Sequence, residues 1–144
     1  MANSAKFPVH SDVAMAVGRI VLGVGTDIVD VARVRSAIER HGERFLHRLF
    51  TDEEIAYCQR HRDPHPFFAA RFAAKEAASK AFGTGIGGGF GWKTFSIAHN
   101  ELGAPLGVLD APGRALLAAR GSTDLLVSLS HTESLGHAVV LLVK

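Results

Sequence analysis

Two carboxylates stand apart from the other acidic residues because each interrupts an apolar segment. Asp27 lies near the end of the apolar stretch RIVLGVGTDIV (19–29), and Glu76 lies within the alanine-rich stretch RFAAKEAASKAFG (71–83). A buried carboxylate without a partner is costly. Carboxylate oxygens are ligands that Mg²⁺ prefers, and one or two of them, completed by waters and substrate phosphates, make its usual site. With a lysine one turn from Glu76, the pair suggests chemistry on a phosphate substrate.

Both carboxylates also have simpler explanations. Glu76 and Lys80 have the i,i+4 spacing of a helix-surface ion pair worth about 0.2–0.5 kcal/mol, and Asp27 could cap a turn or pair with an arginine. On a helix over 71–83 the alanines share one side, and the other side carries Arg71, Phe72, Lys75, Glu76, Ser79 and Lys80. That side is either a solvated charged face or a set of cations that binds an external anion beside a metal on Glu76.

Composition restricts the class of protein. The chain has 144 residues, of which 47% are hydrophobic, so we expect one domain with a real core and exclude a disordered chain. No apolar run reaches the roughly 18–20 residues of a membrane span, and the N-terminal residues lack the pattern of a secretory signal. The single cysteine, Cys58, excludes an internal disulfide and a multi-cysteine metal site. We therefore expect a soluble, cytoplasmic protein.

The order of predicted elements indicates an α+β fold. Residues 19–29 read as a buried strand, Asp30 can cap a helix that ends at Gly42, and a capping box at 51–54 opens a short helix. The remaining predicted elements are a long helix over 67–82, strands over 93–100 and 104–110, a helix over 112–121, and a closing hairpin of 124–131 and 136–144. We expect an antiparallel sheet packed against the long helix. Residues 1–18 would be a flexible extension, and 19–144 a single domain.

Other candidate motifs carry less information. The glycine-rich stretch GTGIGGGFG (83–91) has neither the P-loop pattern nor the dinucleotide-binding context, so it is either a phosphate-binding loop or a plain connector. His61 and His65 have helical spacing, but Pro64 interrupts the helix between them, which argues against a zinc site. Cys58, in a short amphipathic helix, is expected to serve packing rather than nucleophilic chemistry.

Four stretches together resemble a known family. The sequence from about Val21 to Val143 is similar to the holo-acyl-carrier-protein synthases, the small AcpS-type phosphopantetheinyl transferases. The stretches are GVGTDIVDVARV (23–34), FTDEE (50–54), RFAAKEAASKAFGTG (71–85) and VSLSHT (127–132). The resemblance implies that family's fold and its reaction, in which 4′-phosphopantetheine moves from coenzyme A to a serine of an acyl carrier protein and adenosine 3′,5′-bisphosphate leaves.

The resemblance also implies roles for particular residues. Asp27 and Glu76 match the family's magnesium ligands, which bind the pyrophosphate of coenzyme A through the metal. Lys80 would face the same phosphates, Gly85 would help to shape the pocket for the adenosine 3′-phosphate, and His131 matches a position near coenzyme A. The serine proton would pass to Glu76 or to a metal-bound water, and the sequence leaves both alternatives open.

Partner binding is predicted for one basic face. Arg33 and Arg40 share a side of the helix from Val31, and Arg33 matches the family's position for contacting the acidic carrier protein; a solvated basic face is the simpler alternative. The resemblance further implies a homotrimer with sites between subunits. The two rival functions are a non-catalytic coenzyme A or nucleotide-binding module and a protein that binds acidic partners through Arg33 and Arg40. A nucleic-acid partner is disfavoured because the basic residues have no interleaved aromatics.

Overall fold

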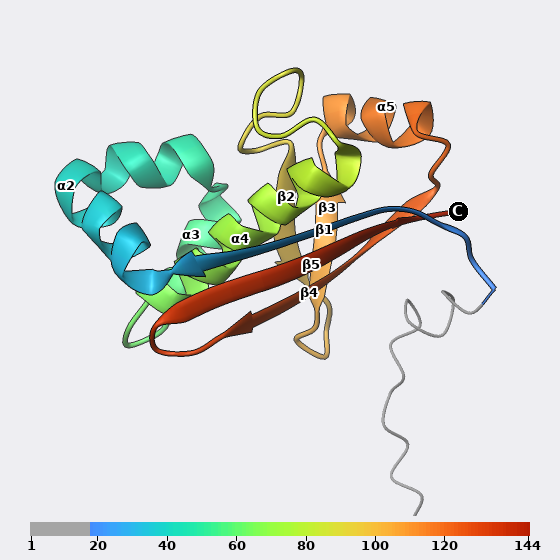
Figure 1. The fold of residues 1–144 in the computed structure, drawn as a ribbon. Coiled ribbons are helices and arrows are strands. Elements are labelled where there is room, and N and C mark those ends of the chain that lie inside the picture. The colour runs from blue at the N-terminus through green and yellow to red at the C-terminus, as the bar shows by residue number, and fades with distance from the viewer. Residues whose placement is uncertain (1–17) are drawn as a thin grey trace, which may run out of the picture.

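The computed structural model describes residues 18–144, in which one long helix is packed among two antiparallel sheets and three further helices (Figure 1). The three-stranded sheet has the order β1-β5-β4, and β2 pairs only with β3. The strands are β1 (Val21–Asp30), β2 (Phe95–His99), β3 (Pro105–Leu109), β4 (Asp124–His131) and β5 (Leu135–Val143). The helices are α2 (Val31–Leu49), α3 (Asp52–Gln59), α4 (His65–Phe82) and α5 (Ala111–Ala119). The predicted α+β fold, with an antiparallel sheet against the long helix, is confirmed.

Glycines in the sheet allow α4 to approach it very closely. A Cβ on Gly25 of β1 would overlap the carbonyl oxygen of Ala77, and one on Gly136 of β5 would come within 2.6 Å of the carbonyl carbon of Ala69. On the helix, Ala73 and Ala77 are completely buried. Since neither surface has bulk, the backbones of helix and sheet themselves are in contact.

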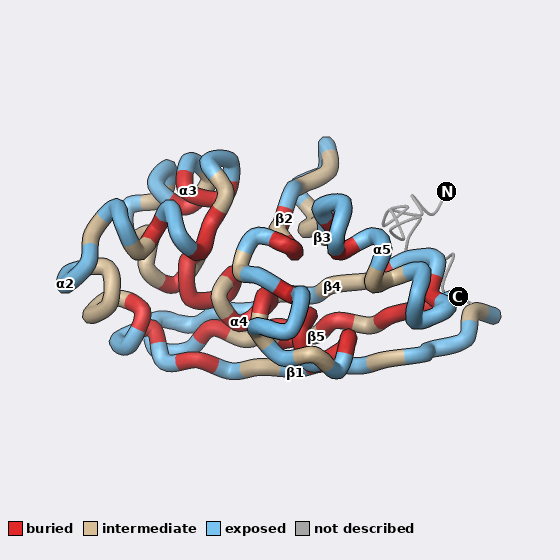
Figure 2. The backbone as a smooth tube through the Cα atoms, turned by 90° about the horizontal axis from the view of Figure 1, so that it is seen from above, coloured by how far each residue is buried: buried red, intermediate tan, exposed pale blue. Residues whose placement is uncertain are grey.

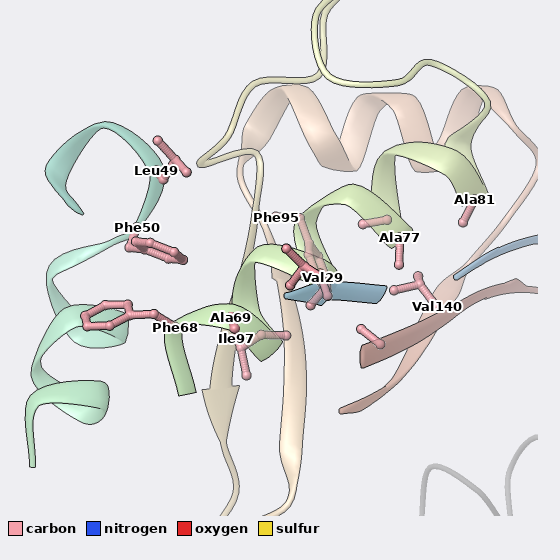
Figure 3. Close-up of a cluster of buried hydrophobic side chains, with 14 of the residues drawn as sticks. Val29, Leu49, Phe50, Phe68, Ala69, Ala77, Ala81, Phe95, Ile97 and Val140 are labelled. Atoms are coloured by element: carbon pink, nitrogen blue, oxygen red, sulfur yellow. The ribbon is translucent and has the colours of Figure 1, made fainter. Parts of the chain in front are cut away.

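The larger apolar side chains fill the space around this contact. Figure 3 shows Phe50 and Phe68 on the side of the α2 and α3 helices, and Val29 and Val140 on the side of the sheet. The rings of Phe50 and Phe68 lie 5.0 Å apart, and Phe95 of β2 is completely buried. The core therefore surrounds α4 and holds it from both sides.

The first helices differ from their predicted limits. The helix from Val31 does not end at Gly42: this glycine, at φ 56°, kinks the chain, and a second helical segment continues to Leu49 and buries Leu46. Asp30 occupies the N-cap position, but its side chain makes no cap hydrogen bond. The long helix begins two residues earlier than predicted because Pro66 is accommodated in its first turn.

The prediction that β1 is a buried strand was wrong for one of its faces. Gly25 and Val29 are buried against α4, but Val24 and Ile28 point the other way and are 63% and 61% exposed. Figure 2 shows this alternation along β1. The apolar sequence therefore describes a strand with one apolar face uncovered in the single chain.

No helix within residues 18–144 is long and apolar enough to cross a membrane. The predicted extension over 1–18 lies outside the described residues, except for Gly18.

Candidate active site between β1 and α4

Asp27 and Lys80 join β1 to α4. Asp27 follows Gly25 by two residues, so it lies on the same strand face and points toward the helix. The ammonium group of Lys80 donates to Oδ1 of Asp27 at 2.9 Å and to the carbonyl oxygen of Thr26 at 3.0 Å. The Asp27 side chain is 17% exposed and that of Lys80 is 52% exposed. The pair is thus anchored in the fold but open to a ligand.

Glu76 lies one helical turn before Lys80 and completes a cluster of two carboxylates and one lysine. Partial burial and then the nearby charge of Asp27 raise the pKa of Glu76, while Lys80 acts in the opposite direction. The simple explanation of Glu76 as a surface partner of Lys80 is wrong, because Lys80 pairs with Asp27. Within residues 18–144 no ion pair of Glu76 is formed. The repulsion between the two carboxylates is therefore only partly neutralised.

The other two cations of α4 are not at this site. Lys75 is completely buried and its ammonium group lies 2.9 Å from Oε2 of Glu54. Arg71, which is 2% exposed, donates to the carbonyl oxygen of Phe67 at 3.2 Å and places its guanidinium 4.1 Å from the ring centre of Tyr57. Both the solvated-face interpretation and the phosphate-binding one were wrong for these two side chains.

Sequence reasoning missed the role of Glu54, although it found the capping box to which Glu54 belongs. The capping box is confirmed: Thr51 accepts from the Glu54 amide, and Glu54 Oε2 accepts from the Thr51 amide at 2.9 Å. Oε1 of the same carboxylate accepts from the amide of Ile97 in β2 at 2.9 Å. The capping-box motif predicted the two hydrogen bonds between Thr51 and Glu54. Only the tertiary fold brings Lys75 and Ile97 to the same Glu54 side chain.

Gly85 and His131 lie toward opposite ends of α4. Gly85, at φ 64°, is in the loop after the helix, and its amide donates to the carbonyl oxygen of Ser79 at 3.2 Å. His131, at the end of β4, packs its ring 4.5 Å from that of Phe67. Phe67 precedes Lys80 by 13 residues, a rise of about 20 Å along a helix. Within one chain, His131 is therefore not part of the Asp27 cluster.

Arg33 and Arg40 do share a surface. Both are exposed on α2 and line one shallow depression of about 450 Å³ together with Ser36, whose hydroxyl accepts from Arg40 at 2.8 Å. Arg35 of the same helix pairs with Asp63 at 3.1 Å instead. The structure thus brings the two predicted partner-binding arginines to one face.

The remaining candidates are structural. Cys58 is completely buried, and burial raises the pKa of its thiol to about 12, which excludes a reactive thiolate at neutral pH. Packing was the predicted role of this cysteine. His61 stacks on Phe67 with ring centres 3.5 Å apart, and its Nδ1 lies 3.0 Å from the carbonyl oxygen of Tyr57.

Comparison with known proteins identifies the family. The model of the 4′-phosphopantetheinyl transferase superfamily matches residues 23–134, which include Asp27, Glu76 and Lys80. The chain belongs to this superfamily. Among curated members, the holo-(acyl-carrier-protein) synthase of Koribacter versatilis (strain Ellin345) is 43% identical over 123 residues, covering 85% of this chain and 98% of the relative.

Solved structures of the superfamily have the same fold. The crystal structure of holo-(acyl-carrier-protein) synthase from Neisseria meningitidis is similar with a TM-score of 0.80 and 34% identity, covering 87% of this chain and all of that one. The synthase of Helicobacter pylori, solved in complex with coenzyme A, has a TM-score of 0.74 and 32% identity over 84% of this chain and 99% of its own. The transferase fold therefore spans β1 to β5.

Proposed function

We propose that this chain is a holo-(acyl-carrier-protein) synthase. It transfers 4′-phosphopantetheine from coenzyme A to a serine of apo acyl carrier protein and releases adenosine 3′,5′-bisphosphate. The observation that carries the proposal is the Asp27–Lys80 pair beside Glu76, in a transferase-superfamily chain that matches a named synthase over 85% of its length.

The reaction breaks one phosphoanhydride bond of coenzyme A. The serine hydroxyl oxygen bonds to the phosphorus that carries pantetheine, and the bond from that phosphorus to the oxygen of the adenosine bisphosphate breaks. Negative charge grows on the leaving oxygen, and the half-exposed ammonium of Lys80 is available to stabilise it. The serine proton passes to Glu76 or to a water beside it.

A divalent cation fits the residues of this site. Asp27 and Glu76 are neighbouring carboxylates whose repulsion one lysine only partly neutralises. Within the described residues no group of three or more metal-binding side chains gathers, so a cation here would rest on these two oxygen donors and on substrate. That donor set is typical of Mg²⁺. We therefore propose that Asp27 and Glu76 hold Mg²⁺, which when bound supplies positive charge to the pyrophosphate.

The function is tested by incubating the purified chain with coenzyme A, Mg²⁺ and apo acyl carrier protein. Mass spectrometry should show a carrier protein heavier by one phosphopantetheine group, and chromatography should show an equal amount of adenosine 3′,5′-bisphosphate. Coenzyme A binding without a mass gain on fatty-acid or polyketide carrier proteins would contradict the proposal and favour the non-catalytic binding module.

We also propose a homotrimer whose sites lie between subunits. Two features support it: the outer face of β1 exposes Val24 and Ile28, and His131 is remote from Lys80 within one chain. An exposed apolar sheet face is typical of an interface. Mixing subunits of Asp27→Ala and His131→Ala should restore about a quarter of the sites if each site takes these residues from different subunits. A fully active monomer in solution, or no recovery on mixing, would contradict the shared site.

The carrier protein is proposed to dock on the depression between Arg33 and Arg40. Exposed arginines there are available to the carboxylates of an acidic partner, where such pairs steer encounter.

We further propose a cytoplasmic location and a role in fatty acid biosynthesis. The buried, unpaired Cys58 is compatible with a reducing compartment. Fractionation of cells expressing the tagged chain tests the location.

A further inference from the structure

The contact between α4 and the sheet sets the distance between them strictly. It restrains the rotation of α4 about its own axis less strictly. The contact is made by alanines against Gly23, Gly25 and Gly136, where an added Cβ would collide with helix backbone. Helices usually interlock with a neighbouring surface through large side chains that fit into its grooves. A surface of alanine and glycine has few such features. On this side the half-exposed Lys80, bonded to Asp27 and Thr26, also restrains the rotation. A buried contact on another side of α4 would set more firmly which way Glu76 points.

The opposite side of α4 supplies that contact through Lys75. Its ammonium group lies 2.9 Å from Oε2 of Glu54 in α3 and donates to the carbonyl oxygen of Phe95 in β2 at 2.7 Å. Both charged side chains are completely buried. Glu54 is itself held by the amides of Thr51 and Ile97, each at 2.9 Å. The end of the Lys75 side chain is therefore fixed by two elements that do not belong to the β1 sheet.

Lys75 immediately precedes Glu76, so the two side chains leave the helix about 100° apart. When Lys75 is held toward α3 and β2, Glu76 is directed to the β1 side, where Asp27 lies. We propose that the buried Glu54–Lys75 ion pair is a positioning pair for the transfer reaction, which sets the rotation of α4 so that Glu76 faces Asp27. The inference rests on the proposed function, because it concerns the site that Asp27 and Glu76 form.

The alternative is that the pair only stabilises the fold. The paired replacement Glu54→Gln/Lys75→Met distinguishes a positioning role from a purely stabilising one. It removes both charges together and leaves neither one buried alone. Ile55→Ala is the matched control: Ile55 is 6% exposed in the same helix, so its truncation loosens α3 without touching the ion pair. Each variant is measured at the same interval below its own unfolding midpoint.

The decisive readout needs no turnover. Mn²⁺ is titrated into each protein with saturating coenzyme A and no carrier protein, and free Mn²⁺ is followed by electron paramagnetic resonance. The paired replacement should weaken Mn²⁺ binding by about tenfold or more, as loss of the groups that orient metal ligands typically does. Its kcat for transfer should fall by about tenfold to a hundredfold, and the KM for carrier protein should change by less than about twofold. Ile55→Ala should bind Mn²⁺ like the parent.

Three results would overturn the inference. The first is that the paired replacement folds and binds Mn²⁺ with the parent's affinity. The second is that Ile55→Ala loses as much Mn²⁺ affinity as the paired replacement. The third is that Ile55→Ala and the paired replacement lose the same fraction of kcat. If the paired replacement does not fold, Lys75→Arg takes its place: it keeps the charge but changes the reach and shape of the group. Lys75→Arg should bind Mn²⁺ more weakly than the parent, by less than the roughly tenfold loss expected for full removal of the pair, and an unchanged affinity would equally refute the inference. A parent protein that transfers nothing would contradict the proposed function instead.

Discussion

Gly25→Ala should disable the candidate active site without touching any of its polar side chains. Gly25 lies under α4 at the level of Ala77 and Ala81, and these alanines flank Glu76 and Lys80 in the helix. The added methyl group would overlap the Ala77 carbonyl oxygen and come within 2.7 Å of the Ala81 amide nitrogen. Since real Cβ contacts are ordinary only from 3.4 Å, relief of the Ala81 contact alone moves the helix away by about 0.7 Å, and relief of the overlap with the Ala77 carbonyl oxygen moves it further.

This displacement affects both stability and catalysis. Overpacking of a close contact typically costs about 1–3 kcal/mol, which for a chain of 144 residues lowers the unfolding midpoint by roughly 3–12 °C. The same movement lengthens the contacts of Lys80 with Asp27 and Thr26, now 2.9 and 3.0 Å. A misplacement of about 1 Å can reduce a reaction rate by about a hundredfold. We therefore expect a folded protein with about 1–10% of the parent's kcat.

The assay combines circular dichroism, thermal unfolding and transfer of phosphopantetheine at a temperature where both proteins are folded. Gly91→Ala is the matched control, because its added Cβ would lie 3.7 Å from the Thr94 hydroxyl, an ordinary contact. That variant should keep both stability and rate. A Gly25→Ala protein with the parent's midpoint and kcat would refute the close helix–sheet contact as the feature that positions the site.

Three further substitutions test single residues. Glu76→Gln should raise the unfolding midpoint at pH 7 by about 1–3 °C. Partial burial first, and then the charge of Asp27, raise the pKa of the Glu76 carboxyl, so its ionised form destabilises the folded state and the gain should vanish below pH ~4. An unchanged midpoint at both pH values would contradict that raised pKa. Lys80→Ala should keep Mg²⁺ dependence while KM for coenzyme A rises or kcat falls by about tenfold or more; a parent-like rate would remove Lys80 from the site. Arg33→Ala should raise KM for carrier protein by about threefold to tenfold and weaken its salt dependence; an equal loss of coenzyme A affinity would contradict a docking role.

The sequence was informative where structure follows from local chemistry. The Thr51 capping box, the glycine stop of α4 at Gly83 and the closing hairpin were all predictable, because caps, glycine conformations and alternating patterns act over a few residues. Asp27 and Glu76 could be selected because a carboxylate within an apolar segment needs a partner.

The sequence predictions were wrong where elements far apart in the sequence determine whether a side chain is buried. Helical periodicity placed Lys75 on a polar side of α4, but it cannot tell that Glu54 and the carbonyl oxygen of Phe95 are buried against that side. Likewise, the apolar sequence of β1 gave no indication that Val24 would lie on an uncovered face, because apolar residues give the same pattern whether or not the core covers them. Periodicity identifies faces, and only the tertiary structure says what covers them.

The most direct test of the account is the rate of phosphopantetheine transfer as a function of Mg²⁺ concentration, for the parent and for Glu76→Ala. The parent should show no transfer with chelator and a saturable rise with Mg²⁺, whereas Glu76→Ala should fold normally by circular dichroism and transfer at least about a hundredfold more slowly. A Glu76→Ala protein with the parent's rate and metal response would show that Glu76 is an ordinary surface residue and that the metal site is wrong.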